Sequence, residues 1–183
     1  MGQHIAAIFI KNQVAGAPHF VLEILGFPPQ SVKQIGESVL LDSYERSDLR
    51  HESVASALVD GWTVVWGRPL FRQFSDAQLS RLSELGWLIY LIVEDTSGTY
   101  GFSLYTDGVV KRRWYESEGE VIVDEGGVLA QEDERDEGLD TDWRVIRVVE
   151  KLSLTFERLY GARWGIYRVE GEKPAASRWQ FWR

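Results

Sequence analysis

Residues 87–124 constrain the fold more than any other part of the sequence, because they read as successive antiparallel strands. Asp107-Gly108 and Glu118-Gly119 each supply a two-residue turn between segments of strand-forming residues. Asp-Gly is among the strongest short signals for a β-hairpin. The four expected strands are Trp87–Val93, Thr99–Thr106, Val109–Glu116 and Glu120–Asp124. We therefore expect an antiparallel meander over this stretch.

Two-residue turns also fix which residues face each other across neighbouring strands. The pairs expected from the first turn are Tyr105–Val110 and Gly101–Trp114. The pairs expected from the second turn are Arg113–Asp124, Arg112–Glu125, Trp114–Val123 and Tyr115–Ile122. A cross-strand pair of opposite charges contributes about 0.2–1 kcal/mol, so the two pairs of arginine and acid support this register.

Helices are expected on both sides of the meander in the sequence, and the clearest one starts at Ser75. Ser75 and Gln78 have the spacing of a capping box, and Phe74 can contact Leu79 as a hydrophobic staple. The longer expected helices cover about 48–60, 75–85 and 142–160, and a short one runs from Pro18 to Gly26. Further strands are expected at Ile5–Ile10, Trp62–Trp66 and Trp164–Val169, whereas residues 30–46 are expected to form a loop.

The length and composition favour one domain. A chain of 183 residues lies in the usual single-domain range, and 44% hydrophobic residues supply enough apolar surface for a core. The expected fold is a single α+β domain over 1–183. Its mainly antiparallel sheet (about 62–66, 87–124 and 164–169) is packed by the three longer helices. Residues 125–141 form an acidic connector, and 171–183 form a tail containing Trp and Arg.

The sequence carries no catalytic signature. It has no cysteine and only three histidines, which excludes thiol chemistry and leaves little material for a metal site. No P-loop, dinucleotide fingerprint or Gly-x-Ser-x-Gly motif occurs. His51-Glu52 begins like a zincin motif, but Ala55 replaces the second histidine. The acidic run from Asp133 is not an EF-hand, because Arg144 replaces the final glutamate. We therefore expect that the protein is not an enzyme and binds neither a cofactor nor a metal ion. A hydrolase that uses paired carboxylates is a third alternative.

The negative charge is concentrated in one segment. Between Glu116 and Asp142 there are twelve acids and one base, Arg135, so this segment carries −11 and the rest +3 of a net −8. Such a segment either keeps a solvated loop soluble or attracts a basic partner. The candidate partner-binding residues are Glu116, Glu118, Glu120, Asp124, Glu125, Glu132, Asp133, Glu134, Asp136 and Glu137. The basic run 111–113 is most simply paired with neighbouring acids.

Eight tryptophans are the second unusual feature of the composition. Those on expected strands and helices favour core positions, but they also allow a second function. In this alternative, Trp62, Trp87 and Trp114 line an aromatic pocket that binds a small molecule or a peptide. Trp179 and Trp182 in the tail are expected to pack back on the sheet or to form part of an interface.

Several short stretches resemble a known group of proteins. They are Asp60-Gly61-Trp62-Thr63-Val64-Val65, Tyr100-Gly101-Phe102, Asp107-Gly108 and the stretch from Gly127 to Glu132. The chain resembles, over roughly residues 60–170, small bacterial α+β proteins found beside polymorphic toxins, including immunity proteins broadly similar to the SUKH group. The first 50 residues do not fit this pattern. The resemblance implies binding and blocking of a cognate toxin, and it assigns no site residue.

The expected setting is the cytoplasm. The first residues lack the basic start and cleavage pattern of a signal peptide, and no apolar run is long enough to span a bilayer. The net negative charge disfavours a nucleic-acid partner, and no membrane association is expected. The leading expectation is a non-enzymatic protein-binding module with a basic toxin domain as partner; the sequence leaves the oligomeric state open.

Overall fold

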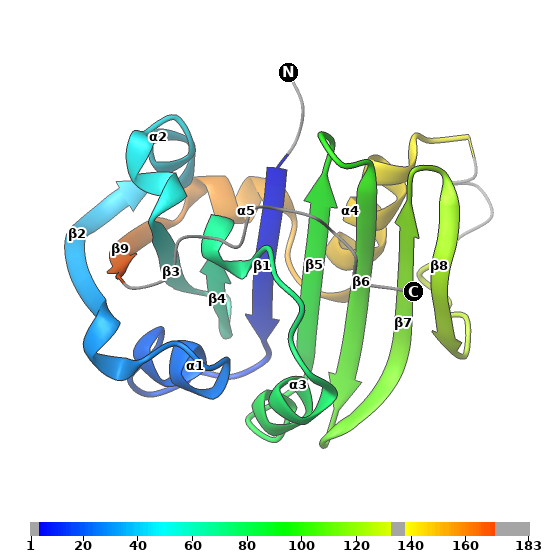
Figure 1. The fold of residues 1–183 in the computed structure, drawn as a ribbon, viewed down its shortest axis with the longest axis horizontal. Helices are drawn as coiled ribbons and strands as arrows, with labels where there is room; N and C mark the ends of the chain where they lie inside the picture. Colours follow the sequence, from blue (N-terminus) through cyan, green and yellow to red (C-terminus); the bar gives the residue numbers. More distant parts are fainter. Residues whose placement is uncertain (1–3, 133–137, 171–183) are drawn as a thin grey trace.

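A nine-stranded antiparallel sheet forms the framework of the computed structural model, which describes residues 4–132 and 138–170 (Figure 1). The order across the sheet is β2-β9-β3-β4-β1-β5-β6-β7-β8. The strands are β1 (His4–Ile10), β2 (Val32–Leu40), β3 (Ser53–Val59), β4 (Trp62–Trp66), β5 (Leu88–Glu94), β6 (Thr99–Thr106), β7 (Val109–Ser117), β8 (Glu120–Gly126) and β9 (Arg163–Val169). The helices are α1 (His19–Ile24), α2 (Leu41–Glu45), α3 (Asp76–Ser83), α4 (Thr141–Leu152) and α5 (Phe156–Gly161). Three 3-10 helices are η1 (Pro29–Ser31), η2 (Asp48–His51) and η3 (Arg68–Leu70).

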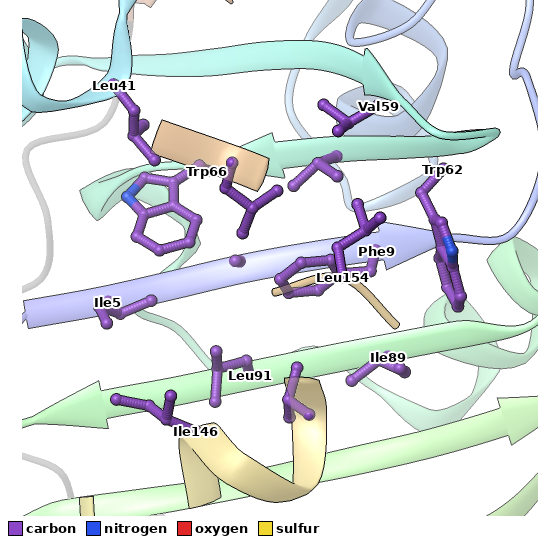
Figure 2. Packing of buried hydrophobic residues seen from close by; sticks show 14 of the residues in the cluster. Ile5, Phe9, Leu41, Val59, Trp62, Trp66, Ile89, Leu91, Ile146 and Leu154 are labelled. Atoms are coloured by element: carbon purple, nitrogen blue, oxygen red, sulfur yellow. The ribbon is translucent and has the colours of Figure 1, made fainter. Parts of the chain in front are cut away.

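Helices cover both faces of the sheet, and this explains why the central strand β1 is apolar from Ile5 to Ile10. Ala7 and Phe9 join the buried cluster beneath α4 and α5, whereas Ile8 and Ile10 join the cluster beneath α1 and α3. Successive side chains of a strand point to opposite faces, so the part of a strand that is covered on both sides is apolar at every position. Figure 2 shows Phe9 packed among residues of both halves of the sheet. The expected α+β class with a mainly antiparallel sheet is confirmed.

The capping box at the start of α3 is present. The Ser75 hydroxyl accepts a hydrogen bond from the Gln78 backbone N–H, and the Gln78 side chain accepts one from the Ser75 backbone N–H. Phe74 and Leu79 are buried in the same cluster. This local signal therefore predicts the helix start correctly.

The meander is confirmed as β5 to β8, but the expected register holds only next to the turns. Tyr105 lies opposite Val110 as expected, whereas Gly101 lies opposite Tyr115 and not Trp114. The shift between Leu104 and Tyr105 leaves one extra residue, Lys111, on β7. A Cβ on Gly101 would collide with the Tyr115 ring, so the glycine makes room for the aromatic side chain that this bulge places opposite it.

A second register shift separates β7 from the expected pairing with β8. Near the turn, Ser117 lies opposite Glu120 and Glu116 opposite Val121, but beyond them β8 moves by one residue. All four pairs expected from this turn are wrong. The observed pairs are Arg112–Gly126, Arg113–Glu125, Trp114–Asp124 and Tyr115–Val123.

The expected helix over 48–60 is wrong, because most of this segment is β3. Only Asp48–His51 is helical, as η2, and β3 then forms a hairpin with β4. Asp60 and Gly61 both have positive φ, as in the tight turns that join two antiparallel strands. The glycine expected to end a helix therefore closes a hairpin.

Two further expectations on the order of elements are corrected. Residues 30–46 do not form a loop: they contain β2, which pairs with β9, and α2. The helix expected over 142–160 is two helices, since Ser153 leaves helical geometry after α4. The Glu150 carboxylate accepts a hydrogen bond from the backbone N–H of Phe156, at 2.8 Å, and so starts α5. In the part of the chain that is described, no helix combines the length and apolarity needed to cross a membrane.

Candidate functional site

The acidic segment meets two buried arginines on β7. Arg112 is 2% exposed and points to the α4 side of the sheet, where its Nε and Nη2 donate to the two carboxylate oxygens of Glu132, each at 2.8 Å. Its Nη1 forms an ion pair with Asp124 and donates to the backbone carbonyl of Glu125. Arg112 thus ties β7, β8 and the connector together.

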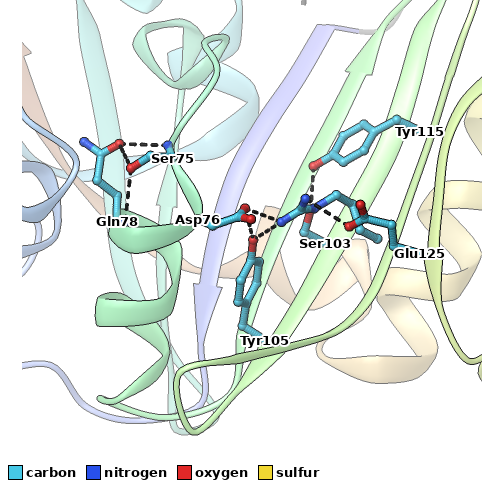
Figure 3. Close-up of polar contacts among 8 residues, drawn as sticks. Ser75, Asp76, Gln78, Ser103, Tyr105, Tyr115 and Glu125 are labelled. Atoms are coloured by element: carbon cyan, nitrogen blue, oxygen red, sulfur yellow. Dashed lines mark hydrogen bonds and ion pairs between the residues drawn. The ribbon is translucent and has the colours of Figure 1, made fainter. Parts of the chain in front are cut away.

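The neighbouring arginine points to the opposite face. Arg113 forms ion pairs with Asp76 at the start of α3 and with Glu125 on β8, the second at 3.0 Å. Its Nη2 also donates to the hydroxyl oxygen of Tyr105, which itself donates to Asp76 at 2.9 Å. Figure 3 shows this group beside the hydrogen-bonded pair of Ser103 and Tyr115. Arg113 therefore links α3 to the hairpin of β7 and β8.

The electrostatics of the group fix its protonation states. The hydrogen bonds that Arg112 donates to the Glu132 carboxylate raise the pKa of Arg112. Burial alone would lower the pKa of Arg113, but its contacts with Tyr105, Asp76 and Glu125 outweigh burial and raise it. Burial raises the pKa of Tyr105 to about 12. Both arginines are thus charged and the tyrosine neutral at pH 7, which suits structural ion pairing better than proton transfer.

The predicted partner-binding acids divide into groups with different surroundings. Asp124, Glu125 and Glu132 are bound by the two arginines, and Glu116 accepts a hydrogen bond from the Thr141 hydroxyl at 3.1 Å. Glu118 and Glu120 are exposed at the tip of the hairpin, and neither forms an ion pair with another described residue. The remaining four, Asp133, Glu134, Asp136 and Glu137, lie outside the described residues.

Asp76 was not among the predicted site residues, although it holds Arg113. Sequence reasoning places it in the first turn of α3, which is a common position for an acid. Its contact with Arg113, 37 residues away, depends on how α3 packs across the sheet. The expected pairing of the 111–113 run with neighbouring acids is observed for Arg112 and Arg113.

The tryptophans of the alternative pocket lie at different levels of the sheet. Trp62 is buried at one end of β4 with Lys11 Nζ 4.8 Å from its ring centroid, and Trp87, 52% exposed, precedes β5 at the same end. Trp114 on β7 lies opposite Phe102 on β6, and Phe102 lies opposite Leu91 in the middle of β5. Trp114 is therefore two strands and four residues from Trp87, about 16 Å at ordinary strand spacings. The structure does not bring the three rings together.

No three His, Cys, Asp or Glu side chains within 4–132 and 138–170 are grouped so that they could hold a metal ion. The chain matches no protein-family model, no curated protein and no solved structure in the three comparisons. The arrangement of Arg112, Arg113 and their carboxylates is therefore the basis for a functional interpretation.

Proposed function

We propose that this chain is a non-enzymatic protein-binding module, an immunity protein that neutralises a cognate toxin. Its contact region is the acidic hairpin surface, defined here as Glu118, Glu120, Asp124 and Glu125. The observation that carries the proposal is the direction of the charges. Two of the three bases on β7, Arg112 and Arg113, are buried, and Lys111 is the one exposed base on this strand, while Glu118, Glu120, Asp124 and Glu125 all face solvent.

Exposed charges at such an edge act on a partner before contact. Each buried arginine is bound by two carboxylates, so a net negative charge remains even at the paired acids. The side chains of Asp124 and Glu125 are still 59% and 55% exposed. A cluster of one sign attracts a partner of opposite charge and raises its association rate. The expected partner surface is thus a basic cleft, which the hairpin occupies so that substrate is excluded.

The buried network supports this role by holding the hairpin in one shape. Arg112 and Arg113 connect β7 with β8, with the connector and with α3. A preorganised surface loses less conformational entropy on binding than a flexible one. Ser103, Tyr105 and Tyr115 use their hydroxyls within the network, which favours a structural role over a catalytic one.

The experiment compares two variants with equal changes in charge. The hairpin variant is Glu118→Lys with Glu120→Lys, and the control is Glu23→Lys with Glu84→Lys, two exposed acids on and next to the helices α1 and α3. The wild type, the hairpin variant and the control are each tagged and used to capture partner proteins from a lysate of the cells in which this protein naturally occurs. A captured protein that is toxic is then co-expressed with each of the three.

The proposal predicts that the wild type and the control capture a basic protein and restore growth, whereas the hairpin variant does neither. It is overturned if the hairpin variant captures the same protein and protects cells as well as the wild type. It is also overturned if the captured proteins do not impair growth.

A further inference from the structure

A second group of charges lies in the other half of the sheet, far from the acidic hairpin surface. It consists of Arg50 and His51 in η2 and of Arg68 at the start of η3. The helix η2 lies between α2 and β3, and η3 follows β4. In Figure 1, α2, β3 and β4 lie to the left of β1, while β7 and β8 lie to the right. We propose that Arg50, His51 and Arg68 form a binding site for an oxyanion, the phosphate or carboxylate group of a ligand.

The backbone around these residues is tightly held. The hydroxyl of Tyr44 donates to the carbonyl oxygen of Ser53 at 2.6 Å, which fixes α2 against the start of β3. Gly67, next to Arg68, packs so closely there that a Cβ would lie 2.8 Å from both of these oxygens. The segments that carry Arg50 and Arg68 are therefore juxtaposed by close packing.

Arg68 has unused hydrogen-bonding capacity. The residue is only partly exposed, yet its side chain forms no hydrogen bond or ion pair with any other residue in the described ranges. A guanidinium carries five N–H donors in a planar fork that matches a carboxylate or a phosphate. The chain has 28 acids and 20 bases, so an arginine side chain that has no acidic partner among the described residues is a candidate for binding an external anion.

The other two members are oriented towards each other. Arg50 Nη1 donates to the backbone carbonyl of Glu45 at 2.8 Å, which anchors the side chain, and its Nε donates to Nε2 of His51 at 3.5 Å. The second contact requires a neutral imidazole. The neighbouring charged groups are Asp48 and Glu52 beside His51, Glu45 beside Arg50, and the ion pair of Asp42 with Arg46 on α2.

The positive charge of the cluster outweighs the nearby acids at His51. Partial burial lowers the pKa of His51, and the charges of Arg68 and then Arg50 lower it further. The opposing effects of Asp48 and Glu52 are smaller. A bound anion would reverse this balance, because it favours the protonated imidazole.

The test is a pH titration of the histidine side chains by NMR. The chain has only three histidines, so His51 is measured together with His4 and His19 as internal references. The titration is run at constant ionic strength in chloride, with inorganic phosphate or with acetate. We expect the oxyanion to raise the pKa of His51 in a saturable way and to leave the two reference histidines unchanged.

Variants separate a site from a general charge effect. Arg68→Gln is expected to weaken the apparent affinity about tenfold or more, since it removes a charge-assisted fork, and Arg68→Lys to weaken it less. The matched control Arg46→Gln removes one positive charge directly after α2 and is expected to leave the affinity unchanged. A response to phosphate alone, to acetate alone or to both supports the site and identifies the ligand class. No response to either ion, or an equal response in Arg68→Gln, overturns the proposal.

Discussion

Arg112 and Glu132 are joined by two parallel hydrogen bonds of 2.8 Å, from Nε and from Nη2 of the arginine. One of the Glu132 oxygens also accepts a hydrogen bond from the backbone N–H of Leu129, at 2.9 Å. Glu132 thus anchors the acidic connector to Arg112 on β7. An acid that the sequence assigns to a partner is used inside the protein.

Glu132→Gln should therefore destabilise the fold. The substitution removes the negative charge beside the guanidinium of Arg112, which is only 2% exposed. The remaining carboxylate of Asp124 does not compensate for this loss. We expect the free energy of unfolding to fall by about 1–3 kcal/mol, measured by urea denaturation at pH 7. Asp60→Asn is the control, because its ion pair with Arg158 is long, 3.8 Å, and exposed; it should change stability by less than about 0.5 kcal/mol. Equal effects of the two variants would contradict the structural role of Glu132.

Gly101 is needed by the packing of β6 against β7. Gly101→Ala should cost about 1–3 kcal/mol, because the new Cβ would overlap the Tyr115 ring and the Trp114 carbonyl oxygen. Gly127→Ala is the matched control, since nothing lies within 4 Å of a Cβ there. Thermal unfolding of both variants checks this, and a Gly101→Ala protein as stable as Gly127→Ala would rule out the observed register.

The capping box gives a third prediction. Ser75→Ala removes the side-chain acceptor for the Gln78 N–H and should lower the free energy of unfolding by about 1 kcal/mol. Ser80→Ala, in the same helix but away from its start, should be neutral or slightly stabilising because alanine is the better helix former. Denaturation curves of the two variants distinguish the cap from a general effect of losing a hydroxyl.

Glu45 makes stability depend on pH in an identifiable direction. Burial raises the pKa of its carboxyl above the ordinary value, although Trp66 Nε1 donates to it at 2.8 Å. The folded state then binds this proton more tightly than the unfolded state, so charged Glu45 destabilises the fold at neutral pH. This cost disappears as the pH falls through the raised pKa.

Glu45→Gln should therefore gain stability relative to the wild type at pH 7 and lose that advantage near pH 4. Gln keeps an oxygen acceptor for Trp66 and places an amide, which can donate to the Tyr160 hydroxyl, where Glu45 accepts a hydrogen bond of 3.3 Å from it, so the main change is the loss of charge. The exposed Glu157→Gln should show no such change with pH. Unfolding free energies at the two pH values give the result; a relative stability of Glu45→Gln that is the same at both would contradict the effect of burial.

The sequence predicts correctly those parts of the fold that depend on a few neighbouring residues. It does not predict those parts that depend on pairing between segments far apart in the chain. The Asp107-Gly108 turn and the Ser75 cap need only a few residues, and both are correct. Gly61 is compatible with the end of a helix and with a hairpin turn, and only the pairing of β3 with β4 and β9 decides between them. The strand β2 depends in the same way on β9, which follows it by more than 120 residues.

The candidate site shows the same division. The acidic character of 116–142 is evident from the sequence, but which acids face inward depends on two bulges and on the packing of α3. The bulge at Lys111 on β7 and the register shift between Tyr115 and Glu116 set the positions of the two arginines relative to β6 and to the acids of β8. Asp76 reaches Arg113 only through the tertiary fold. Local sequence patterns therefore predict which residue types gather in this region. Which acid pairs with which arginine depends on how the side chains pack in the folded protein.

The central claim, that the acidic hairpin surface binds a basic toxin, is tested most directly by association kinetics with the captured partner. Rates are measured for the wild type, for Glu118→Lys with Glu120→Lys, and for the control Glu23→Lys with Glu84→Lys, from about 25 to about 300 mM salt, where screening of exposed charges becomes strong. We predict that the wild type and the control associate fast at low salt and slow steeply as salt rises. The hairpin variant should associate at least about tenfold more slowly at low salt and depend little on salt. Superimposable curves for the wild type and the hairpin variant would contradict the claim.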